Sequence, residues 1–208
     1  MITTIIFDLG GVLIPEKGQE IHARVARHIG VSSQTLENAH TPYKDTMTKG
    51  EITLKDTYET IQRSLGKTYA PEEIVAVHLQ AYMSLCTKRD ERIITLIERL
   101  RRRYKVVALT NTEQEIEKFN KQRRGEEGKT LFGYFHQAFI STDMRMKKPD
   151  AIIYETALKE LSIKPENAIF IDDNQKYIDG ARNVGITSIL YKDPEQLRKE
   201  LKTFDVTF

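Results

Sequence analysis

The sequence predicts an α/β protein with a doubly wound, Rossmann-like parallel sheet and a helical cap domain inserted after the first strand. After residue 105, apolar β-rich runs alternate with helical patterns in units of about 30 residues, which is typical of parallel strands joined by crossover helices. Between residues 15 and 103, helical patterns follow one another without a clear strand signal. We therefore expect a core domain of residues 1–15 and 86–208 and a cap domain of residues 16–85.

The first strand and the helices that follow it are marked by apolar spacing and by breaker residues. Residues 5–7 form an apolar run that stops at Asp8. The helix expected at 19–29 repeats its apolar residues every four positions and ends at Gly30. The same criteria, with Pro and Glu residues opening the third of them, predict helices at 34–40, 53–65, 71–85 and 89–103.

The second half of the chain contains the alternating elements. Short runs of β-branched and apolar residues predict strands at 105–110, 136–140, 167–171 and 187–191. Amphipathic spacing, helped by Pro at two of the starts, predicts helices at 113–122, 149–161, 175–184 and 194–202. Residues 123–129 are polar and contain glycine, so we expect a mobile surface loop there.

Composition and charge exclude several classes of protein. The 208 residues, 39% of them hydrophobic, are enough for one core with a small satellite domain. The net charge of +2 gives no strong attraction to nucleic acid or membranes, and no apolar run approaches the ~20 residues of a membrane span. The single cysteine, Cys86, excludes an internal disulfide, and the first residues lack the charged region of a signal peptide. We expect a cytoplasmic monomer or weak dimer without nucleic-acid or membrane partners.

Reactive side chains follow four of the predicted strands, at the point where each strand ends. In chain order these are Asp8, then Thr110-Asn111, then Ser141 with the nearby Lys147-Lys148, and finally Asp172-Asp173. Ligands of an open parallel sheet bind outside the carboxyl ends of its strands. We therefore expect these side chains to converge on one edge of the sheet, whatever the strand order.

The residue types at that edge indicate phosphoryl transfer. Three neighbouring carboxylates, Asp8, Asp172 and Asp173, would repel one another unless a cation lies between them. Carboxylate and carbonyl oxygens together with a substrate phosphate suit Mg²⁺. Lys148 supplies a positive charge for an anionic substrate, and the second strand ends in a hydroxyl and an amide that can bind phosphoryl oxygens. This combination predicts a reaction through an aspartyl phosphate.

Four separated signatures carry a resemblance to a known family. They read Phe7-Asp8-Leu9-Gly10-Gly11-Val12-Leu13; Leu109-Thr110-Asn111; Met146-Lys147-Lys148-Pro149-Asp150 followed by Ile153-Tyr154; and Ile171-Asp172-Asp173-Asn174 followed by Gly180-Ala181 and Gly185. In this order they resemble the haloacid dehalogenase-like hydrolases, in the branch with a helical cap after strand one. The first motif is similar to that of the sugar-phosphate phosphatases typified by α-D-glucose-1-phosphate phosphatase. The resemblance implies a Mg²⁺-dependent phosphoric monoester hydrolase that acts on a small phosphorylated metabolite.

The resemblance also implies which residues hold the metal. Asp8 would be both the nucleophile and a metal ligand. Gly10 would offer its backbone carbonyl, and Asp173 would be the main metal carboxylate from the fourth strand. Asp172 would be either a ligand or a partner of one.

The same resemblance implies the substrate contacts. Thr110 and Asn111 would hold the phosphate, and Lys148 would bridge Asp8 and the phosphate. Lys147 is the adjacent alternative, but the family's lysine directly precedes proline, which favours Lys148.

One departure from the family pattern concerns the general acid. Most phosphatases of the family carry a second aspartate two residues after the nucleophile, and this chain has Gly10 there. A positioned general acid contributes about 10²–10⁴-fold, so its loss predicts a slower phosphatase rather than an inert protein. Two alternatives follow from Gly10: a catalytically weak protein that binds or senses phosphorylated metabolites, and a metal-independent 2-haloacid dehalogenase. The Asp172-Asp173 pair favours the phosphatase over the dehalogenase.

The cap carries no legible motif, although substrate specificity is expected to reside there. Its histidines His22 and His28 lie six positions apart, a spacing that does not place them on one helix face. His22 lies near the entry to the cap and has the option of facing the cleft, but we expect a surface histidine.

Overall fold

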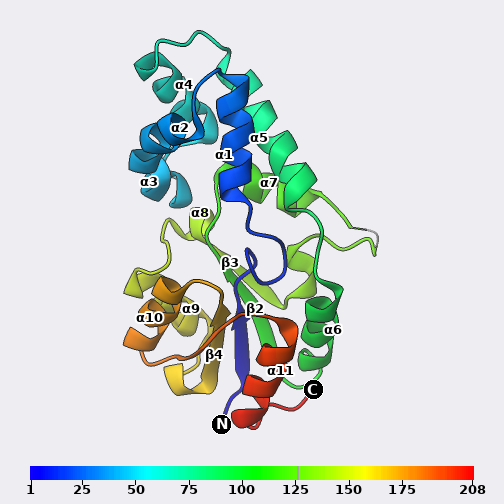
Figure 1. Cartoon of the computed structure of the whole chain (residues 1–208). Helices are drawn as coiled ribbons and strands as arrows, with labels where there is room; N and C mark the ends of the chain where they lie inside the picture. Colours follow the sequence, from blue (N-terminus) through cyan, green and yellow to red (C-terminus); the bar gives the residue numbers. More distant parts are fainter. Residues whose placement is uncertain (126) are drawn as a thin grey trace.

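The computed structural model describes residues 1–125 and 127–208 and confirms the α/β fold. One parallel sheet has the strand order β3-β2-β1-β4-β5 (Figure 1). The strands are β1 (Thr4–Phe7), β2 (Lys105–Thr110), β3 (Gln137–Ile140), β4 (Ala168–Asp172) and β5 (Thr187–Leu190). In the central strand, Thr4 is in register with Lys105 of β2 and Ala168 of β4. The segments that follow β1, β2 and β4 therefore emerge side by side at one edge of the sheet.

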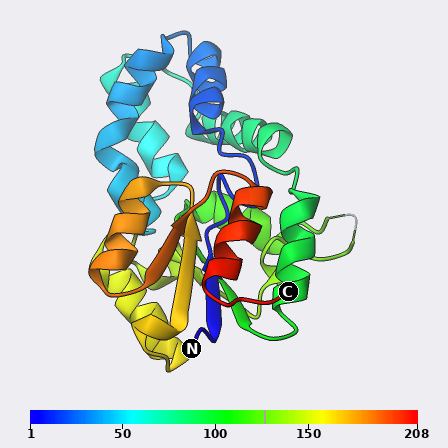
Figure 2. The same ribbon diagram turned by 60° about the horizontal axis from the view of Figure 1, so that its bottom comes forward.

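Helices cover both faces of the sheet because its strands are apolar on both sides. Ile5 and Phe7 of β1 share a buried cluster with residues of α6 (Glu91–Leu100), α7 (Gln114–Gln122) and α11 (Pro194–Thr203). Ile6 points to the other face and packs in a second cluster with α9 (Ala151–Leu161) and α10 (Gln175–Asn183). Figure 2 shows α11 and α6 (red and green) separated by the sheet from α9 and α10 (yellow and orange). This burial on both faces is typical of doubly wound sheets.

The chain between β1 and α6 forms a helical layer with a core of its own. Its helices are α1 (Gly18–His28), α2 (Ser33–His40), α3 (Lys44–Thr48), α4 (Leu54–Ser64) and α5 (Pro71–Leu85). Val25, Leu36, Tyr58 and Ile74, from four of them, meet in a third buried cluster. Figure 1 shows these helices stacked beyond the carboxyl edge of the sheet. We propose that this layer is the cap domain, with the boundaries 16–85 expected from the sequence.

Local chemistry explains why the longer helices begin close to where the sequence predicts. Thr53 and Asp56 form a reciprocal capping box at the start of α4, and α5 begins with Pro71 followed by two glutamates. The helices α3 and α8 (Ser141–Met144) were not predicted, because they are short and polar. The remaining short turns are the 3₁₀ segments η1 (Thr41–Tyr43), η2 (Phe132–Tyr134) and η3 (Pro165–Asn167).

Two further expectations concern the chain as a whole. The surface loop expected at 123–129 includes Glu126, which lies outside the described residues. Within the described part of the chain, no helix combines the length and the apolar character that crossing a membrane requires.

Candidate active site

A buried lysine joins two carboxylates at the carboxyl edge of the sheet. Asp8 follows β1, and Asp172 ends the neighbouring strand β4. Lys148 reaches both: its Nζ lies 2.7 Å from Oδ1 of Asp8 and 2.6 Å from Oδ2 of Asp172. The lysine is 1% exposed and Asp8 is 6% exposed. Charges buried this deeply persist only when they compensate one another, so these three side chains act as one unit.

The three charges set one another's protonation. Burial alone would lower the pKa of Lys148, but the carboxylates of Asp8 and Asp172 outweigh it and the pKa is raised. Lys148 is therefore an ammonium ion. Burial raises the pKa of Asp172; the Lys148 ammonium opposes this rise, Asp8 adds to it, and the net shift is upward. Burial of the Asp172 carboxylate, together with the charge of Asp8, thus outweighs the effect of the Lys148 ammonium.

Asp173 completes a group of three carboxylates that fits a divalent cation. One oxygen from each of Asp8, Asp172 and Asp173 lies within 4.8 Å of the others. The Asp173 side chain lies against Gly11, where an added β-carbon would be 2.0 Å from Oδ2 of Asp173 and where φ is +74°. Only glycine fits this position, so the Gly-Gly turn makes room for the carboxylate. Burial, and next the charge of Asp8, raise the pKa of Asp173. A cluster of oxygen donors with excess negative charge suits Mg²⁺.

The two aspartates of β4 have different surroundings. Oδ2 of Asp172 accepts a hydrogen bond from Lys148, and Oδ1 accepts one from the Asn174 backbone N–H at 2.8 Å. Within the described residues, no such bond engages the Asp173 carboxylate or Oδ2 of Asp8. Asp8 and Asp173 are therefore the carboxylates whose oxygens are available to a ligand. Asp172 instead fixes the position of the Lys148 side chain.

The end of β2 holds the lysine loop in place. The side-chain amide of Asn111 makes a reciprocal pair with the main chain of Lys148: Nδ2 donates to the Lys148 carbonyl at 3.0 Å, and Oδ1 accepts from its N–H at 3.0 Å. Thr110 is buried beside it. From the sequence, Asn111 was expected to hold phosphate through its amide. In the structure that amide is bonded to the main chain of Lys148, and the Thr110 hydroxyl makes only a long contact, 3.5 Å, with the Asn111 carbonyl.

The preceding lysine points toward the cap. Nζ of Lys147 lies 3.2 Å from Oδ1 of Asp45 in α3. The two adjacent lysines thus contact different layers: Lys147 pairs with a residue of α3, and Lys148 pairs with Asp8 at the sheet edge.

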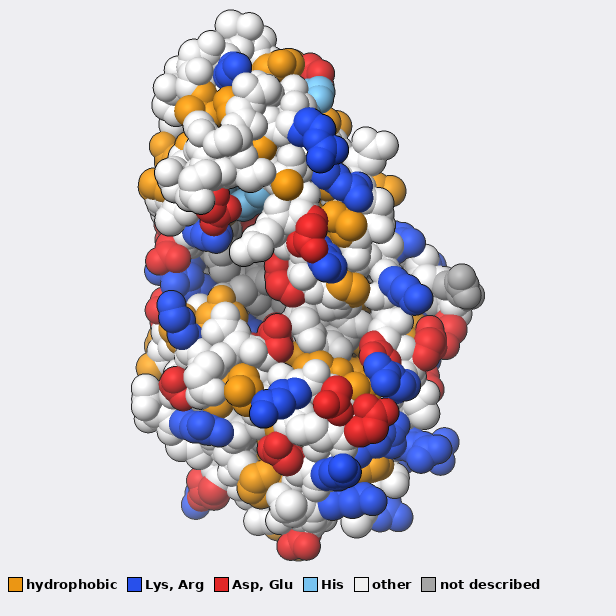
Figure 3. All heavy atoms as spheres, viewed as in Figure 1, with side chains coloured by type: hydrophobic (Ala, Val, Ile, Leu, Met, Phe, Trp, Pro, Cys, Tyr) orange, Lys and Arg blue, Asp and Glu red, His pale blue; other side chains and the backbone are white. Residues whose placement is uncertain are grey.

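Two adjoining cavities, which share Thr110 and Asn111 in their lining, lie between the sheet edge and the helical layer. The first, which we call the site cavity, has a volume of about 440 Å³ and contains every predicted site residue except Asp172. The second, the cap cavity, has a volume of about 240 Å³ and extends from Thr110 and Asn111 toward α1, α2 and α5. Figure 3 shows a hollow between the two layers with acidic and basic side chains at its rim. Glu16 and Glu113 border both cavities.

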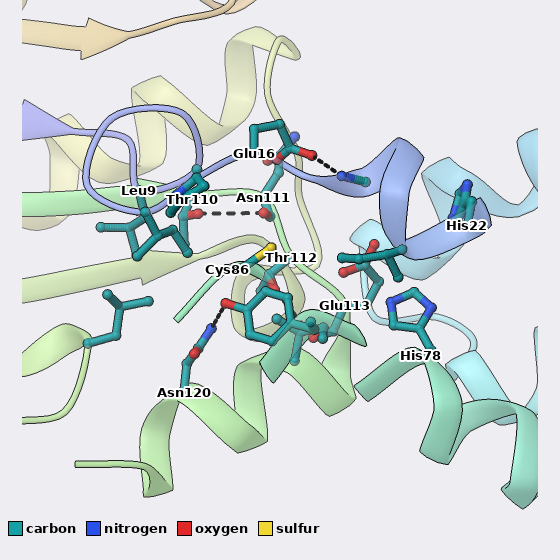
Figure 4. Close-up of a pocket in the computed structure, with 18 of the residues that line it drawn as sticks. Leu9, Glu16, His22, His78, Cys86, Thr110, Asn111, Thr112, Glu113 and Asn120 are labelled. Atoms are coloured by element: carbon teal, nitrogen blue, oxygen red, sulfur yellow. Dashed lines mark hydrogen bonds between the residues drawn. The ribbon is translucent and has the colours of Figure 1, made fainter. Parts of the chain in front are cut away.

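Glu16 is a site residue that the sequence analysis missed. It lies in the link from β1 to α1, where Oε1 accepts a hydrogen bond from the Gly18 N–H at 2.9 Å (Figure 4). Its other oxygen, Oε2, would lie 3.2 Å from a β-carbon placed on Gly10. A carboxylate from six residues further along the chain therefore occupies the space next to position 10. Two features of the sequence could have indicated this role: the glycine at position 10 and the glutamate that follows it six residues later.

Three cap histidines were also missed. His22, expected at the surface, is 8% exposed and faces the cap cavity, so that expectation was wrong. His40 and His78 line the same cavity from α2 and α5. Figure 4 shows His22 and His78 on the cap side of the cavity, across from Thr110 and Asn111. No spacing within one helix predicts this group, because each histidine comes from a different helix.

The fold and the site together describe a parallel α/β protein with a helical layer above an aspartate–lysine centre. The model of the haloacid dehalogenase-like hydrolases matches residues 2–185, and the chain belongs to this family.

Several characterised proteins are similar over nearly the full length. The D-ribitol-5-phosphate phosphatase of Bacteroides thetaiotaomicron is 23% identical, and the match covers 97% of both chains. The sesquiterpene phosphatase of Aspergillus oryzae is 26% identical over 95% of this chain and 93% of that protein. A crystal structure of a haloacid dehalogenase family enzyme from Bacteroides thetaiotaomicron, in complex with magnesium and inorganic phosphate, superposes with a TM-score of 0.77. It shares 25% identity and covers 92% of this chain and 95% of that one.

Proposed function

We propose that this chain is a Mg²⁺-dependent phosphatase that hydrolyses a small phosphorylated metabolite, a sugar phosphate, through an aspartyl phosphate on Asp8. The observation that carries the proposal is the placement of Asp8, held by the buried Lys148 at the floor of the site cavity beside Asp173. Two similar proteins that are phosphatases, and a similar enzyme that holds magnesium with inorganic phosphate, support it.

The carboxylates and the turn after β1 would hold the metal. Asp8 and Asp173 would contribute carboxylate oxygens and Gly10 its backbone carbonyl, with Asp172 as a supporting partner through Lys148. When bound, Mg²⁺ neutralises the substrate phosphate and the carboxylate that faces it. This added positive charge would also oppose the rise in the pKa of Asp173 and so favour its carboxylate form.

The protein groups divide the reaction between them. An oxygen of Asp8 attacks phosphorus while the P–O bond to the alcohol breaks, and water later hydrolyses the acyl phosphate to release orthophosphate and free Asp8. Lys148 pairs with Asp8 before attack and with the phosphoryl oxygens during it, and Thr110 donates its hydroxyl to the same oxygens. Asn111 keeps Lys148 in place through the paired main-chain hydrogen bonds.

Glu16 takes the role of the general acid that is missing because position 10 is a glycine. Its Oε2 lies beside position 10, and Glu16 lines both the site cavity, which Asp8 also lines, and the cap cavity. The leaving alcohol passes between the two cavities. We assign to Glu16 the transfer of a proton to the leaving oxygen and the later acceptance of one from the attacking water.

The test of the proposed function is orthophosphate release from a panel of sugar phosphates, polyol phosphates and 4-nitrophenyl phosphate. We expect turnover with Mg²⁺, loss of turnover with excess EDTA, and recovery when Mg²⁺ is restored. Activity that survives the chelator contradicts the proposal. Absence of turnover, with Mg²⁺-dependent thermal stabilisation by a sugar phosphate, would favour the metabolite-binding alternative, and halide release from 2-haloacids without metal would favour the dehalogenase.

The role of Glu16 predicts a dependence on the leaving group. In Glu16→Gln the amide oxygen still accepts from the Gly18 N–H, so the start of α1 is preserved while the proton donor is lost. We expect kcat/KM for a polyol phosphate to fall about 10²–10⁴-fold. The fall for 4-nitrophenyl phosphate should be much smaller, because nitrophenolate leaves without a proton.

Glu20→Gln is the matched control for Glu16→Gln, since Glu20 lies in the first turn of α1 and pairs with Lys17 at the surface. We expect this variant to behave as wild type with both substrates. Equal losses for the two substrates in Glu16→Gln would reject the assignment.

A further inference from the structure

His40 is a buried imidazole with unused hydrogen-bonding capacity. It is 1% exposed and borders the cap cavity. Neither ring nitrogen has a hydrogen-bond partner among the described residues. A buried polar group left unpaired costs about 1–3 kcal/mol, so a ligand that supplies the partner recovers that free energy.

The neighbouring imidazoles are each held by one nitrogen. Nδ1 of His22 lies 2.6 Å from Oε2 of Glu37, and Nδ1 of His78 lies 2.8 Å from the Tyr58 hydroxyl. The His22 and His40 rings pack edge to face with centroids 4.4 Å apart. These contacts fix the orientation of the group through Nδ1 of His22 and Nδ1 of His78. The result is a preformed polar wall.

The charge of this wall favours neutral partners. Burial lowers the pKa of His40 and of His78 to about 3, so each presents one donor and one acceptor near neutral pH. Lys44 is the one lysine or arginine among the described residues that line the cap cavity, and its Nζ already lies 3.0 Å from Oε1 of Glu37. Glu113 also borders the cavity. A second anionic group on the ligand would therefore meet carboxylates without a free cation.

We propose that His22, His40 and His78 form a leaving-group subsite for a neutral, polyhydroxylated alcohol, whose hydroxyl groups hydrogen-bond to His40. This inference rests on the proposed phosphatase function of the adjoining site cavity and names the class of alcohol that is released. An isoprenoid alcohol would leave His40 unpaired, and a site built for hydroxyl groups discriminates strongly against ligands that lack them. The wider family includes phosphatases of both substrate kinds, as the D-ribitol-5-phosphate and sesquiterpene enzymes illustrate.

The experiment compares three substrates in His40→Leu, His40→Gln and wild type: D-ribitol 5-phosphate, farnesyl monophosphate and 4-nitrophenyl phosphate. We expect wild type to prefer the polyol phosphate. His40→Leu should lose about 10- to 100-fold in kcat/KM for that substrate, with at most a small change for 4-nitrophenyl phosphate. His40→Gln, which retains a donor and an acceptor, should recover part of the loss. His28→Leu is the control, because His28 lies in the cap but outside the cap cavity.

A binding measurement separates failure of the subsite from failure of the proposed function. Calorimetry on Asp8→Asn with Mg²⁺ should show D-ribitol 5-phosphate binding weakened by the added His40→Leu change, with orthophosphate binding unaffected. Binding of this kind without turnover in wild type would reject the phosphatase and keep the subsite. Unchanged polyol selectivity in His40→Leu, equal losses for all three substrates, or a wild-type preference for farnesyl monophosphate would overturn the subsite.

Discussion

Replacing Asp8 with asparagine is expected to abolish phosphate release, with kcat lower by at least about 10⁴-fold, as when the nucleophile of other covalent hydrolases is removed. The amide is too weak a nucleophile to attack phosphorus, and it also removes one of the two charges that hold Lys148. The measurement is steady-state orthophosphate release with Mg²⁺, together with acid-quench detection of phosphorylated protein in wild type and its absence in the variant.

The control for Asp8→Asn is Asp143→Asn, an exposed aspartate that pairs with Lys121 far from the nucleophile in sequence. This control should retain wild-type turnover. Turnover of Asp8→Asn within tenfold of wild type would show that another group attacks the phosphate and would remove the aspartyl phosphate from the mechanism.

Replacing Lys148 with methionine is expected to lower the free energy of unfolding by about 3–5 kcal/mol and to eliminate activity. The loss arises because removal of one partner leaves buried charges without compensation, here those of Asp8 and Asp172. The measurement is urea unfolding in the absence of Mg²⁺, so that metal binding does not mask the effect.

The neighbouring residue provides the control, because Lys147 pairs with the exposed Asp45. Lys147→Met should change the free energy of unfolding by no more than about 1 kcal/mol. Similar losses in the two variants would contradict the view that only Lys148 carries a buried charge network.

The destabilisation of Lys148→Met should also depend on pH. Burial already raises the pKa of Asp172, and loss of the ammonium that opposes this shift raises it further. A carboxyl group with a raised pKa in the folded state binds more protons there than in the unfolded state, so stability falls as pH rises. We therefore expect a smaller difference from wild type at pH 5 than at pH 8.

The chemistry at the sheet edge was predictable because it depends on strand ends. Asp8, Thr110 and Asp173 each follow a β-rich run, and parallel strands bring their ends together whatever their order. The use of Asn111 was not predictable in the same way. Its amide binds the main chain of Lys148, a contact that depends on the path of the loop after β3.

The polar residues on the cap side could not be predicted from the sequence, because they come together only in the tertiary structure. Glu16 reaches position 10 through the path of the link into α1, and no periodicity encodes that path. His22, His40 and His78 come from three helices whose packing is set by apolar contacts elsewhere in the cap. Sequence spacing within each helix therefore gave no signal, and His22 was expected at the surface for this reason.

The two adjacent lysines differ in the free energy that is needed to break their ion pairs. Lys148 is locked into the core by two buried carboxylates, whereas Lys147 touches the cap through one pair whose aspartate is exposed. Exposed ion pairs contribute only about 0–1 kcal/mol, so parting Lys147 from Asp45 costs little, while disturbing Lys148 costs several times more. Breaking the contact between Lys147 and α3 would therefore leave the network of Asp8, Lys148 and Asp172 intact. Glu16 is tied through its carboxylate to the first residue of α1, so the proton transfer that we propose for it depends on the position of that helix.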